Sequence, residues 1–248
     1  MSAPNNKRGM AQWPSWASHW LGYRASPLKP ESQPVVYFWS FLASFCTISI
    51  LQALFGYVAY FQARQVPSII GSFGASAVLC FDVIAVPLAQ PRALVGGHFI
   101  SALVGVCITR LVHVGRESQP DYLRWFAGSF STSLAIVAMR ATKTTHPPAG
   151  ATALLAAVEP SVYALGWYYI PVVLLSSVIV LVLALFFNNI QRRYPMFWIK
   201  PTPPPKAISA PVEQPTAHGP LSGERENDVA EDRLKETSEG LTDLEKGS

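Results

Sequence analysis

The sequence predicts an all-α protein that crosses a membrane several times, a polytopic transmembrane helical bundle. Half of the 248 residues are hydrophobic and only 14% are charged, whereas soluble domains carry about 25% charged residues. The mean hydropathy of the whole chain is +0.25. Long stretches between residues 35 and 195 contain no charge at all. These three observations favour insertion into a membrane over folding in water.

Six apolar segments follow one another along the chain. A membrane helix needs about 20 apolar residues, because the hydrocarbon core is about 30 Å thick and each residue adds about 1.5 Å. The first and last segments exceed this length, whereas the second and fifth are short and contain Gly or Pro. The six segments are residues 35–63, 65–81, 93–114, 122–140, 144–158 and 160–191.

The two short segments share a pattern, which suggests an internal repeat. The six residues from Gly74 are Gly-Ala-Ser-Ala-Val-Leu, and those from Gly150 are Gly-Ala-Thr-Ala-Leu-Leu. Each short segment lies between two longer ones. This order predicts two three-helix repeats, each with a short broken or re-entrant helix, as in transporters whose binding sites lie at such helices. Chance similarity between small-residue segments is the alternative, and the chain crosses four or six times depending on the short helices.

Charge divides the chain into three parts. Residues 1–34 form a basic N-terminal tail, and residues 35–199 form the transmembrane domain. Residues 200–248 are proline-rich and then acidic, and from residue 201 they carry 5 basic and 10 acidic side chains, a composition typical of a disordered tail. Residues 1–200 carry a net charge of +9. Basic residues at both ends of the apolar part place both termini in the cytoplasm; the organelle stays open.

The motif Thr-His-Pro-Pro-Ala-Gly-Ala-Thr begins the fifth segment. Proline is favoured in the first turn of a helix, so a helix is expected to begin near Pro147 and Pro148, with Thr145 or His146 near the capping position. A helix that begins inside a membrane protein presents N–H groups and a positive dipole end, which attract anions. A helix-packing turn with His146 at an interface is the alternative. If His146 binds, its unperturbed pKa of about 6.5 allows proton coupling.

The corresponding helix start in the first repeat lies at Ser72 and Gly74. Arg92 follows a broken Pro-Leu-Ala-Gln-Pro connection and suits an oxyanion, although an interfacial anchor is the simpler role. Arg140 or Lys143 could balance the anion's charge instead. The candidate anion-binding residues are therefore His146, Pro147, Pro148, Gly150, Ser72, Gly74, Arg92, His98 and Arg140.

No enzymatic chemistry is expected. The core histidines have no i,i+4 pairing and no acid in a ligand pattern, so neither a metal site nor a cofactor is predicted. Cys46, Cys80 and Cys107 lie in apolar segments without a Cys-x-x-Cys spacing, as buried free thiols would. Nothing in the sequence points to a catalytic residue or a nucleic-acid partner.

Taken together, six motifs resemble those of the HPP family of integral membrane proteins, named after the triplet His146-Pro147-Pro148. The resemblance implies a bundle of four or more spans and a role in nitrite transport, as in chloroplast-envelope and cyanobacterial members. Bacterial relatives often carry CBS domains after the bundle, which the polar residues 200–248 do not resemble. In chain order the motifs are Ser72–Leu79, Pro87–Arg92, Gly96–His98, Ser101–Val106, His146–Leu154 and Asn188–Pro195.

The sequence thus predicts a transporter or channel-like protein for a small anion, with nitrite as the leading candidate. The alternative is a non-transporting membrane scaffold or assembly protein that acts through helix packing and its C-terminal tail. The expected partners are the lipid bilayer and a small anion. A second copy of the chain and proteins that bind the tail are further candidates.

Overall fold

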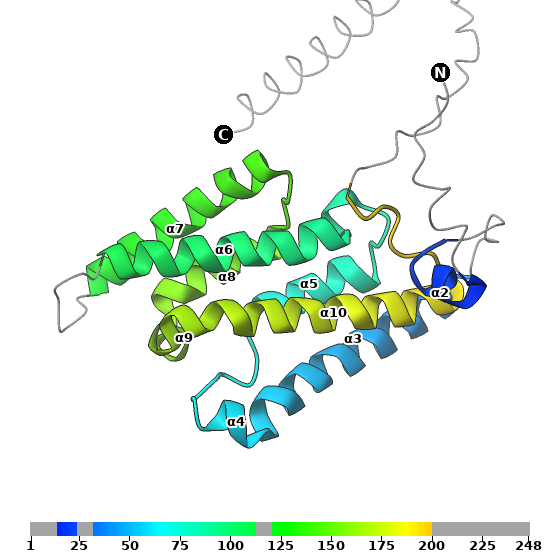
Figure 1. Ribbon diagram of the computed structural model, residues 1–248, viewed down its shortest axis with the longest axis horizontal. Helices are drawn as coiled ribbons and strands as arrows, with labels where there is room; N and C mark the ends of the chain where they lie inside the picture. Colours follow the sequence, from blue (N-terminus) through cyan, green and yellow to red (C-terminus); the bar gives the residue numbers. More distant parts are fainter. Residues whose placement is uncertain (1–13, 24–31, 113–120, 200–248) are drawn as a thin grey trace, which may run out of the picture. The chain divides into compact units, whose positions relative to one another are not determined.

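A computed structural model describes residues 14–23, 32–112 and 121–199, all within the first of two compact units, Met1–Thr202 and Pro203–Ser248. Those ranges contain helices and no strand (Figure 1). The helices are α2 (Ser15–Trp20), α3 (Gln33–Tyr57), α4 (Ala59–Gln62), α5 (Ser72–Phe81), η1 (Pro87–Ala89), α6 (Pro91–Val112), α7 (Asp121–Thr142), α8 (Pro147–Val158), α9 (Pro160–Leu165), η2 (Gly166–Tyr168) and α10 (Tyr169–Gln191).

The prediction of an all-α membrane bundle is confirmed. Among the described residues, three stretches are long and apolar enough to cross a membrane: 33–57, 91–112 and 160–191. Helix α7 has 22 residues, as many as α6, but its composition is less apolar. The order of long, short and long helices occurs twice, at the predicted segments. Symmetry between the two halves stays a prediction.

Prolines mark where the helices begin. Pro34, Pro91 and Pro147 each lie in a first turn, where the missing N–H costs no hydrogen bond. His146 precedes a proline and therefore has an extended backbone, with φ −137° and ψ 103°. The helix start predicted from the Pro-Pro pair is thus correct.

Each short helix runs back along the long helix that precedes it, and four or six crossings remain the predicted alternatives. Gly56, near the end of α3, lies beside Ser68, four residues before α5 begins, and α5 ends where Ser40 Oγ donates to the Phe81 carbonyl at 2.9 Å. The chain therefore returns along α3 between Ser68 and Phe81. Helix α8 returns along α7 in the same way, and its last residue Val158 lies beside Gly128.

Glycines allow α6, α7 and α8 to pack closely. A Cβ atom on Gly105 of α6 would lie 2.8 Å from the Ala153 carbonyl oxygen of α8. A Cβ atom on Gly97 would lie 2.8 Å from the His146 Cβ. Small residues at such contacts let membrane helices approach each other closely. This packing places the first turn of α8 against α6.

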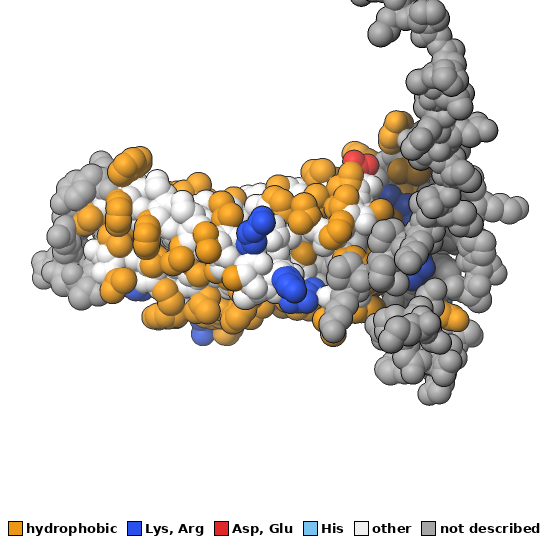
Figure 2. Space-filling model, turned by 90° about the horizontal axis from the view of Figure 1, so that it is seen from above, with side chains coloured by type: hydrophobic (Ala, Val, Ile, Leu, Met, Phe, Trp, Pro, Cys, Tyr) orange, Lys and Arg blue, Asp and Glu red, His pale blue; other side chains and the backbone are white. Residues whose placement is uncertain are grey.

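The surface of the bundle is largely apolar, as contact with lipid requires. Figure 2 shows one face, on which hydrophobic side chains predominate and Lys and Arg side chains are few. Large side chains are exposed on the outer helices, including Phe41 (70%) on α3 and Val137 (63%) on α7. In water such a surface would cause aggregation.

The residues after α10 and the helix α2 lie at one end of the bundle. Trp198 Nε1 donates to the Leu21 carbonyl at 3.2 Å, and His19 Nε2 contacts the Asn189 carbonyl at 2.9 Å. The Tyr194 hydroxyl donates to the Ala89 carbonyl at 2.6 Å, and burial raises the pKa of this phenol well above its usual range. Helix α2, within the expected basic tail 1–34, therefore packs on the bundle. The predicted C-terminal tail lies outside the described residues.

Candidate functional site

The first turns of α5 and α8 lie side by side in the interior of the bundle. Ser72 Oγ lies 2.8 Å from Thr152 Oγ1, and Ser76 Oγ lies 2.9 Å from His146 Nε2. The later residue of α5 pairs with the earlier residue of the α8 segment, so the two short helices run antiparallel. The two helix starts therefore meet in the interior of the bundle.

A fully buried histidine pair lies at this contact. His98 comes from α6 and His146 is the N-cap of α8, and both are 0% exposed. The Ser76 hydroxyl joins them, with Oγ 2.8 Å from His98 Nε2 and 2.9 Å from His146 Nε2. The two ring centroids are 5.0 Å apart, and Phe73 stacks on His98 at 4.4 Å. We call Ser72, Ser76, His98, His146 and Thr152 the histidine cluster.

One end of the cluster determines the tautomer of His146 when this histidine is neutral. The Leu88 carbonyl oxygen only accepts, so His146 donates to it from Nδ1 at 2.8 Å and accepts from Ser76 at Nε2. The Ser76 hydroxyl has one hydrogen, so it cannot donate to both histidines. If Ser76 donated to the Ser72 carbonyl at 3.2 Å instead, His146 Nε2 would lack a hydrogen bond.

The other end of the cluster determines the donor at His98 Nδ1. Thr152 Oγ1 donates its one hydrogen to Ser72 Oγ at 2.8 Å, so His98 Nδ1, which lies 2.8 Å from Thr152 Oγ1, donates to that oxygen. Hydrogen-bond contacts thus connect Ser72 to the Leu88 carbonyl through Thr152, His98, Ser76 and His146. One added proton on His98 lets its Nε2 donate to Ser76 while Ser76 donates to His146, so every ring nitrogen of the cluster then has a partner.

The helix starts offer few free N–H groups to an anion. Pro147 and Pro148 have no N–H, and the Ala149 N–H donates to the His146 carbonyl at 2.9 Å. In α5 the N–H groups of Phe73 and Gly74 donate to the carbonyls of Ile70 and Gly71. The N–H groups of Ala149, Phe73 and Gly74 are therefore occupied by backbone carbonyls, and an anion cradle at the remaining N–H groups stays a prediction.

Among the other sequence-derived candidates, the two glycines lie in different surroundings. Gly150 is buried, yet no atom outside the neighbouring backbone of its own helix lies within 4 Å of a Cβ atom placed there, so there is space beside the first turn of α8. Gly74 is exposed and also has open space around it, so it lies on the outer side of α5.

The cationic candidates lie apart from the histidine cluster. The Arg92 guanidinium donates to the carbonyls of Thr142 at 2.6 Å and Ile199 at 3.2 Å. Arg140 is exposed on α7. Arg92 and Lys143 line a cavity of about 420 Å³ together with the residues of the Pro87–Gln90 turn and of the C-terminal segment.

Ser76 and Thr152, which complete the cluster, were not among the sequence-derived site residues. They occupy the same position in the two short segments, the second residue after Gly74 and Gly150 respectively. A hydroxyl at the same place in both copies was the signal that could have identified them.

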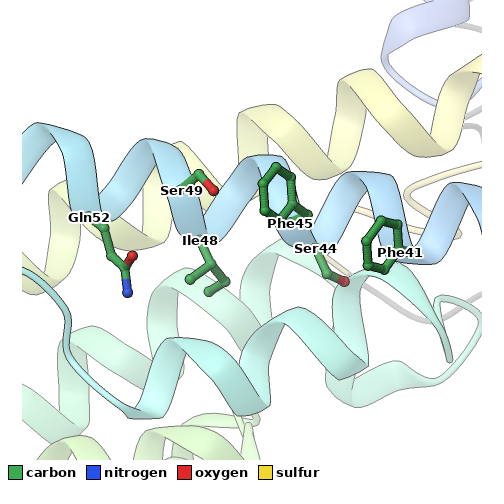
Figure 3. A pocket seen from close by; sticks show the side chains of 6 residues that line it. All are labelled: Phe41, Ser44, Phe45, Ile48, Ser49 and Gln52. Atoms are coloured by element: carbon green, nitrogen blue, oxygen red, sulfur yellow. The ribbon is translucent and has the colours of Figure 1, made fainter.

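A second cavity, of about 440 Å³, lies along α3 (Figure 3). Its lining comes from that one helix and includes Phe41, Ser44, Ile48 and Gln52. None of its lining residues is charged or titratable, so it offers no chemistry like that of the histidine cluster. Within the described ranges, no three His, Cys, Asp or Glu side chains lie together as a metal site would require.

Comparison with known proteins gives a family. A family model described as the HPP transmembrane region matches residues 29–195. A transmembrane protein of Dictyostelium discoideum is 41% identical over 182 residues, which cover 72% of this chain and 56% of that protein. Another transmembrane protein of that organism is 39% identical over 183 residues, which cover 72% of this chain and 61% of that protein. The chain thus spans less than two thirds of these relatives, and no solved structure matches it.

Proposed function

This chain belongs to the HPP family of membrane proteins, and on that premise we propose that it transports a small anion across a lipid bilayer. Nitrite is the leading candidate substrate, because transport of nitrite is the role that the family resemblance implies. The observation that supports transport most directly is the buried histidine pair between two antiparallel short helices.

Buried ionisable groups are costly inside a membrane protein and are usually retained for ion or proton pathways. Discontinuous helices likewise form substrate sites in many transporters. In this proposal the histidine cluster takes up one proton while an anion passes, so that the imidazolium compensates the anion's negative charge. The open space beside Gly150 gives the cluster room to rearrange.

A catalytic role agrees less well with the geometry. Ser76 and His146 have the spacing of a nucleophile and its base. The Ser76 hydroxyl, however, is 0% exposed and also contacts His98. Because this oxygen is buried and contacts both histidines, a proton-holding role fits better than nucleophilic attack.

The test is anion uptake by the purified full-length protein in liposomes. Uptake of nitrite, nitrate, chloride and formate is measured with and without an acidic exterior, against protein-free liposomes, because nitrous acid crosses bilayers unaided. We expect nitrite uptake above that background and faster uptake with the acidic exterior. His146→Ala should reduce uptake to the background, whereas Ser177→Ala, in α10, should not.

No protein-dependent flux of any anion, from protein shown to be folded, would exclude this function and leave the scaffold alternative. Flux that survives in His146→Ala would instead retain transport and exclude the histidine cluster from it.

A further inference from the structure

The cavity beside Arg92 has the charge and shape of an anion site. Its volume is about 420 Å³, and its lining includes the cations Arg92 and Lys143 and no carboxylate. Among the described residues, no Asp or Glu forms an ion pair with either cation. Two positive charges therefore lie at one cavity without a neighbouring negative charge in the described part of the chain.

Arg92 keeps donors for a ligand. It is the second residue of α6, where the positive end of the helix dipole makes a cation unfavourable. Its Nη2 group donates one N–H to the Thr142 carbonyl, and its Nη1 group donates one N–H to the Ile199 carbonyl. A guanidinium has five N–H donors, so three have no hydrogen-bond partner among the described residues, and its planar fork suits an oxyanion.

Lys143 occupies a backbone position that favours glycine. It follows α7 with φ +58°, and the Thr144 N–H donates to the Met139 carbonyl at 2.9 Å, the bond that closes a helix C-terminus. Left-handed backbone disfavours a residue with a Cβ atom. The lysine therefore lowers stability at this turn while it contributes a second cation to the cavity.

One turn separates this cavity from the histidine cluster. Pro87 and Gln90 line the cavity, and between them the Leu88 carbonyl accepts from His146 Nδ1. Gln90 holds the turn, because its Nε2 donates to the Ile84 and Val86 carbonyls and its Oε1 accepts from the Met196 N–H. A charge on His146 thus lies close to an anion in the cavity.

We propose that the cavity binds a small oxyanion between Arg92 and Lys143, as the site from which the transported anion reaches the histidine cluster. The site rests on the proposed function for its role in transport, but binding itself does not depend on flux. A phosphate group of a lipid shares this chemistry, so the experiment separates a free anion from a lipid headgroup.

The test measures binding through the rise in melting temperature with nitrite concentration, for full-length protein in detergent at constant ionic strength. Lys143→Gly should raise the melting temperature without anion by about 2 °C and weaken nitrite binding by about tenfold. The matched control is Gln65→Gly, which removes the same backbone strain at φ +53° away from the cavity. That variant should gain the same stability and bind nitrite as the wild type does.

Unchanged nitrite affinity in Lys143→Gly would overturn the site, even if uptake into liposomes is intact. Nitrite binding that is weakened in Lys143→Gly but not in Gln65→Gly would support the site, even if no flux is found. A second arm repeats the melting-temperature measurement with other ligands in place of nitrite. These are inorganic phosphate and vesicles of phosphatidylcholine with or without phosphatidylglycerol. Stabilisation by phosphatidylglycerol alone, with none by nitrite or phosphate, would assign the cavity to a lipid headgroup and overturn the free-anion site.

Discussion

At the scale of single residues, Ser76 has the central place in the histidine cluster. Its hydroxyl oxygen lies 2.8 Å from His98 Nε2 and 2.9 Å from His146 Nε2, so both imidazoles depend on it for a hydrogen bond. Nothing in the identity of this serine distinguishes it from others in the apolar helices. Ser177, for example, is equally buried, but its hydroxyl donates to the Val173 carbonyl of its own helix at 2.7 Å.

This difference leads to a prediction for stability. Ser76→Ala leaves two buried ring nitrogens without partners and should lower the free energy of unfolding by about 2–4 kcal/mol. Ser177→Ala removes only a bond within one helix and should cost at most about 1 kcal/mol. Thermal unfolding in detergent compares the two variants. Equal melting temperatures would contradict the hydrogen-bond chain through Ser76.

At the scale of helices, the separation of α6 from α8 depends on glycine. Gly105→Ala would bring a Cβ atom to 2.8 Å from the Ala153 carbonyl oxygen and 2.9 Å from the Ala156 Cβ. Neither atom belongs to a flexible side chain, so the helices must move apart, at a cost of about 1–3 kcal/mol.

The control is Gly74→Ala in α5, where no atom lies within 4 Å of the added Cβ. Alanine favours helix over glycine, so this change should stabilise the protein by about 0.5–1 kcal/mol. Chemical or thermal unfolding of both variants measures the difference. A loss of stability in Gly74→Ala as large as that in Gly105→Ala would contradict the packing described for α6 and α8.

Helix boundaries could be predicted only in part. The start of α8 followed from its two prolines, whereas the segment predicted at residues 65–81 becomes helical only from Ser72. Gln65 has φ +53° and precedes Val66 and Pro67, and a residue before proline disfavours the helical region. Hydrophobicity alone does not reveal this break.

At the scale of the whole molecule, the chain divides after Thr202. Since the described helices and the histidine cluster lie before that point, removal of residues 203–248 should leave the melting temperature and the nitrite flux unchanged. The measurement compares truncated and full-length protein in the same liposomes. A loss of flux from folded truncated protein would show that transport needs the tail, and an unchanged flux would argue against the scaffold alternative.

The sequence by itself determined the class of the protein, its apolar segments and the helix start at the His-Pro-Pro triplet. These features depend on composition and on prolines and glycines, whose effects on the backbone are local. Only the tertiary structure decided which polar groups meet: His98 with His146 through Ser76, and Arg92 with Lys143 at a separate cavity. The relative rotation and direction of packed helices decide such contacts, and these arise from many weak contacts distributed over the bundle.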